Sequence, residues 1–244
     1  MMESLVNHLP DYQRPPVVEV AVSVQFESPV LSGPQVMLWW SQVRDNFPGL
    51  EQVAPLPPSI ETFEPPKESQ RRVELRILDA PPSPRVFLVN KEGTELLQIQ
   101  QDRFGYNWRK LKPEDAYPRY STIREHFARE LMAFEEFLVK EQLGKIVPTQ
   151  CEVTYVNHIL GEGVWEQHGE LHKVIPSITP SEDFPPMLED VQLASRYVIR
   201  DREGKPLARL YVHVEPRYLT SGMVRIILMQ LTTRGAPQGS GLEG

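Results

Sequence analysis

The feature that most constrains the fold is a long amphipathic helix that directly follows a strand, between residues 95 and 144. Along the expected helix, apolar residues recur at spacings of four, four, three and four, at Ile123, Phe127, Leu131, Phe134 and Leu138. These spacings follow the period of an α-helix, so the five side chains share one stripe. The other side carries the charged residues Arg124, Glu125, Arg129, Glu130, Glu135, Glu136, Lys140 and Glu141. Such a helix buries its stripe against a sheet or another helix.

The ends of this helix carry signals of their own. Ser121 and Thr122, with Glu125 three residues after Thr122, predict a capping box at the start. Gly144 predicts the end, because a glycine adopts the left-handed conformation without a Cβ clash.

The stretch before the helix, LLQIQQDRFGYNWRK, is predicted to be one strand. Neither of its alternating faces is apolar throughout, which predicts that the core side switches near Asp102, at a bulge at Gly105. Its far end is either a basic and aromatic groove for an anionic or nucleotide-like ligand, or a strand end with core aromatics and solvated charges. The second situation is the more common one in proteins. The candidate binding residues in this stretch are Arg103, Tyr106, Asn107, Trp108 and Arg109.

Size and charge restrict the class of protein. The chain has 244 residues, of which 40% are hydrophobic and 24% charged, and this indicates a globular protein with a sizeable core. The formal net charge of −7 argues against general affinity for nucleic acid, although a local basic patch stays open. The single cysteine, Cys151, excludes an intramolecular disulfide and fits a reducing cytoplasm. We expect neither a signal peptide nor a membrane span, because no apolar run is long enough.

Further elements follow from the same periodicities. Alternation predicts strands at residues 17–26, 72–78, 85–90, 149–159, 193–200, 207–215 and 223–232. A second helix is predicted after Ser32, with the stripe Val36, Trp39, Trp40, Val43 and Phe47. The proline-rich residues 54–66 predict an extended connector with a short edge strand at residues 60–63.

The order of these elements predicts an α+β fold in which a strand–helix–strands unit occurs twice. We expect a curved antiparallel sheet of seven or eight strands with helices on one face. By analogy of element order this is the saddle of the TATA-box-binding protein, and fold analogy alone transfers no function. The predicted organisation is a flexible arm (1–14), a first half (15–145), a second half (146–234) and a disordered tail (235–244).

The second half lacks the closing helix that the first half has. The residues after Leu231 read TTRGAPQGSGLEG, which is too rich in glycine, serine and proline to form a helix. Part of the apolar sheet face then stays uncovered, and an uncovered apolar face is a binding site. We expect a protein partner or a second copy of the chain to cover it.

Signals for metal binding or catalysis are weak. His168 and His172 lie four residues apart, but the pattern is not the HExxH metal motif and Gly169 weakens a helix, which favours a solvated loop. Cys151 and His158, seven residues apart in one strand, point to opposite faces and form no nucleophile–base pair. Because phosphate-binding and nucleophile motifs are absent, we expect no cofactor, and an enzyme is the least favoured class.

Charge is unevenly divided in the second half. Residues 160–190 hold seven acidic residues and one lysine, a net −6, whereas residues 191–235 hold eight basic and three acidic residues, a net +5. Either the acidic stretch folds over the basic strands and neutralises them, or the basic surface is open to RNA, DNA or an acidic protein. The candidate binding residues here are Arg196, Arg209 and Arg225.

Four stretches resemble a known family. They are QIQQDRFGYNWRK, YPRYSTIREHF, PPVVEVAVSVQF and CEVTYVNHI, and the resemblance covers most of residues 15–233. They are similar to a sporadically distributed family of uncharacterised prokaryotic proteins of about this length, which has no assigned activity. Its scattered distribution implies an accessory role, for example in a toxin–antitoxin or phage-defence system, and its members end in a further helix.

These features favour a non-catalytic binding module in the cytoplasm, with another protein or a second copy of the chain as its partner. The first alternative is a nucleic-acid or nucleotide binder that uses Arg103, Trp108, Arg109 and the later arginines. The second alternative is an enzyme of unknown type.

Overall fold

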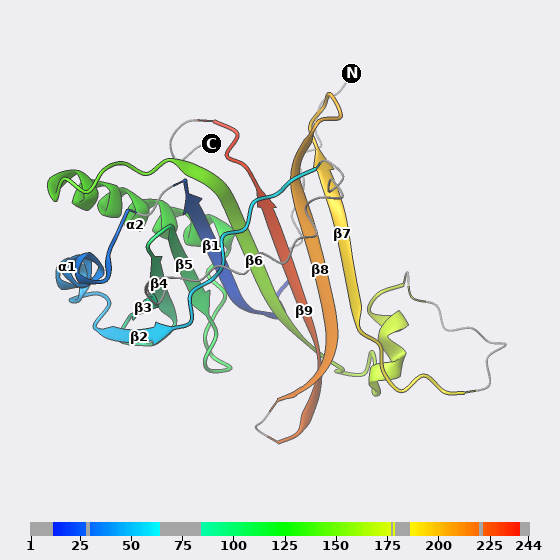
Figure 1. Cartoon of the computed structure of the whole chain (residues 1–244). Coiled ribbons are helices and arrows are strands. Elements are labelled where there is room, and N and C mark those ends of the chain that lie inside the picture. The colour runs from blue at the N-terminus through cyan, green and yellow to red at the C-terminus, as the bar shows by residue number, and fades with distance from the viewer. Residues whose placement is uncertain are drawn as a thin grey trace.

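One antiparallel sheet contains all the strands that the structure describes. The computed structural model describes residues 12–27, 30–63, 84–176, 178, 186–219 and 222–239. Within these ranges nine strands lie in the order β2-β3-β4-β5-β1-β6-β9-β8-β7, and all neighbours are antiparallel. The sheet is open and curved, with α1 and α2 behind one face (Figure 1), which confirms the predicted α+β class.

The bounds of the elements are as follows. The strands are β1 (Val17–Phe26), β2 (Gly49–Val53), β3 (Arg85–Val89), β4 (Glu95–Gln100), β5 (Arg103–Arg109), β6 (Pro148–Leu160), β7 (Leu193–Arg200), β8 (Pro206–Leu219) and β9 (Val224–Gly235). The helices are α1 (Gly33–Val43), α2 (Tyr120–Lys140) and the short 3-10 helix η2 (His168–Lys173). No helix in the described part of the chain is both long and apolar enough to cross a membrane.

The predicted stripe of α2 forms the centre of the core. Phe134 is 0% exposed, and its ring lies 5.5 Å from the ring of Trp39 in α1 and 5.0 Å from that of Phe104 in β5. Val20, Val22 and Val24 of β1 belong to the same buried cluster. The periodicity prediction for both helices is therefore confirmed, because their apolar stripes meet one face of the sheet.

The start of α2 differs from the prediction. The helix begins after Arg119, whose φ of 74° turns the chain, and no side chain caps it, so the predicted capping box at Ser121 and Thr122 is wrong. Glu130, which was predicted on the solvent side, is buried and forms an ion pair with Arg129. The predicted end at Gly144 is also wrong: α2 ends at Lys140, and Gln142, with a φ of 57°, is the left-handed residue that caps it.

The stretch from Glu95 to Arg109 is a hairpin of two strands, and the predicted bulge at Gly105 is wrong. Gln100 pairs with Arg103 across β4 and β5, so only two residues form the turn. This reversal explains why the core side seemed to switch along the sequence. Gly105 serves close packing instead, because a Cβ there would lie 3.1 Å from the Cβ of Ser23 on β1.

Other predicted boundaries also shift. An edge strand forms at Gly49–Val53, not at residues 60–63, and the predicted strand at 72–78 lies outside the described residues. β9 extends to Gly235, which pairs with Cys151, so the ordered sheet reaches one residue into the predicted tail. Of the predicted arm, Tyr12 to Arg14 are described, and Arg14 forms an ion pair with Glu162.

The strands β7 to β9 are covered differently from β1 to β5. A small cluster formed by Trp165, Leu171, Val214 and Ile227 packs η2 and its flanking residues onto β8 and β9. The segment that the sequence predicted to be irregular thus contains a 3-10 helix. No helix comparable to α2 lies on these strands in the described part of the chain.

Candidate binding surfaces of the sheet

The predicted aromatic and basic residues of β5 lie on opposite faces of the sheet. Tyr106 and Trp108 are buried on the helix-covered face, where the Tyr106 hydroxyl lies 3.0 Å from Nδ1 of His126. The Trp108 ring packs 5.5 Å from that of Tyr117. Burial raises the pKa of the Tyr106 hydroxyl, with a further contribution from Glu95. These aromatic side chains are core residues, so they do not share a groove with the arginines of the same strand.

The other predicted residues of β5 are engaged on the polar face. Arg103 is buried and donates from Nη2 to Oε1 of Gln25 at 2.9 Å. Asn107 donates to Oε1 of Glu19 at 2.5 Å, and Arg109 donates from Nε to the carbonyl of Gly93 at 2.7 Å. Burial lowers the pKa of Arg103, and Glu152 and Asp102 oppose that shift. The prediction that the charges at this end of the strand are solvated is wrong for Arg103.

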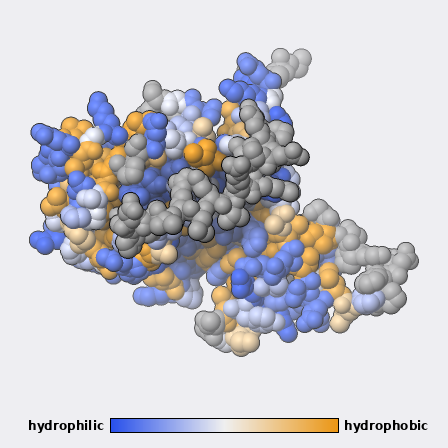
Figure 2. Space-filling model, viewed as in Figure 1, coloured by the Kyte–Doolittle hydropathy of each residue, from blue (hydrophilic) through white to orange (hydrophobic). Residues whose placement is uncertain are grey.

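The polar face is crossed by residues 54–63, here called the strap, which leave β2 and run in front of the sheet toward β8 (Figure 1, cyan). Three glutamines, on β4, β1 and β6, bind its backbone. Gln100 accepts from the amide of Leu56 at 2.8 Å and donates to its carbonyl at 2.9 Å. The amides of Ser59 and Glu61 donate to Gln25 (2.9 Å) and Gln150 (3.1 Å). Figure 2 shows the same side of the molecule, and the surface visible beside the grey atoms at the middle of the sheet is mainly hydrophilic.

At the end of the strap, the side chain of Glu61 is held by a carboxylate clamp, defined as Arg209, Tyr211 and Arg234. The Glu61 side chain is only 3% exposed. Its carboxylate forms an ion pair with Arg209, accepts from the hydroxyl of Tyr211 at 2.6 Å and lies 3.3 Å from Nη1 of Arg234. Arg234 also donates to Glu152 at 2.6 Å. Two arginines of the basic strands are thus neutralised on the polar face of the sheet.

The acid that neutralises the basic strands is not where the sequence predicted it. In the described part of the acidic stretch, Glu162 pairs with Arg14 and Glu170 pairs with Lys173. No ion pair in the described residues joins that stretch to β7, β8 or β9. Glu61 fulfils this role instead, and no local sequence signal marks it.

Arg196 and Arg225, by contrast, are exposed on β7 and β9. β7 is an edge strand, which pairs only with β8 among the described residues. Its side chains Tyr197 and Ile199 are 56% and 39% exposed. Tyr197 pairs with half-buried Leu210 of β8, and half-buried Leu231 of β9 lies on the same face of the sheet, which α1 and α2 cover elsewhere. We call Tyr197, Ile199, Leu210 and Leu231 the apolar patch.

His168 and His172, the weak candidates for a metal site, both lie in the 3-10 helix η2. His168 is buried between the rings of Trp165 and Tyr218, and its Nε2 lies 3.1 Å from the carbonyl of Ile226. The prediction of a solvated loop is therefore wrong for His168. Within the described ranges, no three His, Cys, Asp or Glu side chains lie together in a metal-binding arrangement.

Glu170 caps η2 and gives a testable pH dependence. Its carboxylate accepts from the amide of Glu166 at 2.7 Å and pairs with Lys173, and these contacts lower its pKa to about 2. Because the folded pKa lies below the ordinary value of 4.5, the contribution to stability is complete above about pH 4.5 and is lost as the pH falls toward 2. The protection factors of the η2 amides, which are corrected for the intrinsic pH dependence of exchange, should therefore fall over this range, and Glu170→Gln should remove that fall. Protection factors that change equally with pH in the unaltered chain and in Glu170→Gln would contradict the assignment.

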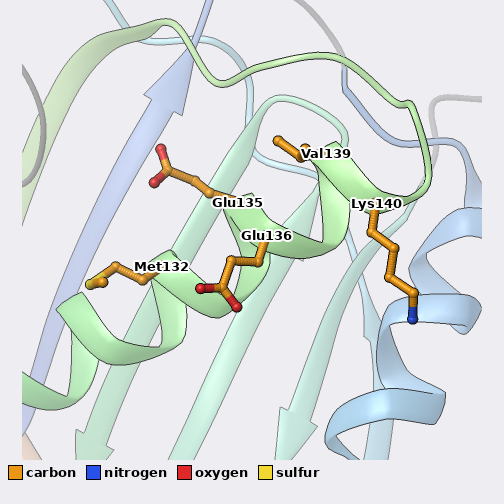
Figure 3. Close-up of a pocket in the computed structure, with 5 residues that line it drawn as sticks. All are labelled: Met132, Glu135, Glu136, Val139 and Lys140. Atoms are coloured by element: carbon orange, nitrogen blue, oxygen red, sulfur yellow. The ribbon is translucent and has the colours of Figure 1, made fainter.

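A shallow depression lies on the solvent side of α2. It is lined by Met132, Glu135, Glu136, Val139 and Lys140, all exposed residues of one helix (Figure 3). Because all five lining residues are exposed, the depression does not shield a reacting group from water.

A scan against protein-family models finds no match to this chain, and a search of the curated proteins finds none either. The surfaces themselves therefore carry the argument about function. The polar face binds an extended segment of the chain, and β7, whose outer edge pairs with no other strand among the described residues, lies beside exposed apolar side chains.

Proposed function

We propose that this chain is a non-catalytic module that binds another protein through β7 and the apolar patch. The observation that carries the proposal is that an edge strand with Tyr197 and Ile199 exposed continues into Leu210 and Leu231 on one face. An unpaired edge beside apolar side chains is the surface to which a partner adds a strand. We place this function in the cytoplasm, where the half-buried thiol of Cys151, whose pKa burial raises, stays reduced.

The partner segment we propose is an extended strand in which apolar and acidic residues alternate. Tyr197 and Ile199 point to the apolar side of β7, whereas Arg196 points to the polar side. A strand added to this edge would place its apolar residues beside Tyr197 and Ile199 and an acidic residue beside Arg196. Pairing of two β7 strands would bring like charges together, which disfavours a dimer formed through this edge.

The strand order supports a duplicated saddle as the basis of this function. Counted outward from the centre of the sheet, one set of strands has the order β1-β5-β4-β3 and the other has the order β6-β9-β8-β7. In each set the strand that comes first in the sequence is central, the strand that comes last lies next to it, and the two between them in sequence lie further out. We propose that the two sets are equivalent halves, as in the saddle of the TATA-box-binding protein. α2 then covers the first half, and the partner covers the equivalent part of the second.

A charge exchange on β7 tests the proposal. We expect the peptide (Val-Glu)4 to bind the full chain about tenfold more tightly than (Val-Lys)4 and to slow amide exchange in β7. In the variant Arg196→Glu this preference should reverse. Lys205→Glu makes the same charge change in an exposed residue outside the strand, so this control should keep the original preference.

Three results would overturn the proposal. They are equal binding of the two peptides, a preference that Arg196→Glu does not alter, and light scattering that shows a dimer with β7 protected. Steeply salt-dependent binding of a single-stranded oligonucleotide that Arg196→Glu abolishes would favour the nucleic-acid alternative instead.

A further inference from the structure

We infer that the polar face of the sheet is a second binding groove, specific for an extended peptide that carries a carboxylate, and that the strap occupies this groove in the present structure. The inference is independent of β7, because the strap lies on the opposite face from the apolar patch. It rests on the three glutamines and the carboxylate clamp.

The glutamines recognise peptide backbone and not side chains. Gln100 contacts both the amide and the carbonyl of Leu56, as a neighbouring strand would. Gln25 and Gln150 accept from amides further along, at Ser59 and Glu61. Any extended peptide with free amides at these three places could make the same contacts. Pro55 precedes the first of these places, and Pro57 and Pro58 lie between the first and the second, so no proline stands where an amide is needed.

The clamp adds selectivity for a carboxylate. Two guanidinium groups and one hydroxyl converge on Glu61, and charge-assisted hydrogen bonds of this kind are the strong ones in proteins. Arg209 also donates to the carbonyl of Thr62 at 3.1 Å and lies 4.9 Å from the centre of the Phe63 ring. The groove thus recognises an acidic residue followed, two positions later, by an aromatic one.

The strap is held in a way that permits exchange. Its residues 54–63 make no backbone–backbone hydrogen bond with the rest of the described chain. A competing peptide could therefore replace it without breaking the sheet. The strap has the advantage of being covalently attached, which corresponds to an effective concentration on the order of millimolar, so an external ligand must bind more tightly than the isolated strap sequence or be present above that concentration.

The test supplies the strap as a separate molecule. A fluorescent peptide with the sequence of residues 54–63, APLPPSIETF, is titrated into the full-length Glu61→Ala variant, in which the clamp has lost its own carboxylate. We expect saturable binding. The same peptide with glutamine in place of glutamate should bind about tenfold more weakly, because it lacks the charge that the clamp recognises. The double variant Glu61→Ala, Arg209→Ala should weaken binding of the acidic peptide by a similar factor.

Two further arms keep the inference falsifiable. Urea unfolding verifies that Glu61→Ala is folded. If Glu61→Ala does not fold, the titration uses Glu61→Gln instead, which keeps the shape of the side chain. In the unaltered chain, excess peptide should accelerate amide exchange at Leu56, Ser59 and Glu61. Absence of binding to a folded variant together with unchanged exchange in the unaltered chain would overturn the inference. So would equal binding of the two peptides, or preferential binding of a single-stranded oligonucleotide.

Discussion

Replacing Phe134 by alanine should lower the free energy of unfolding by about 4 kcal/mol, the largest effect that we expect from a single substitution. The side chain is fully buried, and its ring contacts Trp39 of α1 and Phe104 of β5. Its removal leaves a cavity where both helices meet the sheet, and the surrounding rings cannot close it without leaving their own contacts. Urea denaturation, followed by tryptophan fluorescence, measures the change.

Met132 provides the matched control for that substitution. It lies on the same helix, two residues away in sequence, but is 51% exposed. Met132→Ala should change the free energy of unfolding by less than about 0.5 kcal/mol. Similar losses for the two variants would show that the stripe of α2 does not form the core.

Replacing Glu61 by alanine should cost about 3 kcal/mol of stability, which is the second large effect. The substitution leaves Arg209 and Arg234 together on the polar face without the carboxylate that separates their charges. The neighbouring Ile60 is 64% exposed, so Ile60→Ala should be close to neutral in the same urea experiment.

A double-mutant cycle connects this loss to the clamp. Glu61→Ala and Arg209→Ala should each destabilise the chain, and the double variant should lose at least about 1 kcal/mol less than the sum of the two. Additive losses would mean that the two side chains do not interact, and would leave the strap without its main anchor.

The sequence is informative wherever a structural feature repeats within a few residues. The stripe of α2 was predictable because one face of a helix recurs every three or four positions. The bounds of β7 were also predicted, since turn residues flank the strand on one side and Asp201 to Gly204 form a tight turn on the other. The hairpin between β4 and β5 was missed because its turn, Gln101 and Asp102, contains neither glycine nor proline.

The candidate sites were less predictable, because their residues meet only in the folded sheet. Glu61 and Arg209 are separated by 148 positions, and no periodicity relates two residues so far apart. Strand alternation already places Arg103 and Trp108 on opposite faces, but the unrecognised hairpin obscured which of the two faces belongs to the core. The lack of a second closing helix in the sequence predicts an apolar face without a helix beside β7, whereas no sequence signal predicts the strap across the opposite face.

Amide hydrogen exchange, measured residue by residue on the free chain and again with excess (Val-Glu)4, examines the open edge and the occupied groove together. The structure predicts that the amides of Leu56, Ser59 and Glu61 are protected in the free chain, and that outward-facing amides of β7 become protected only when the peptide is added. Unprotected strap amides, together with a β7 edge that the peptide leaves unchanged, would contradict both the occupied groove and the open edge.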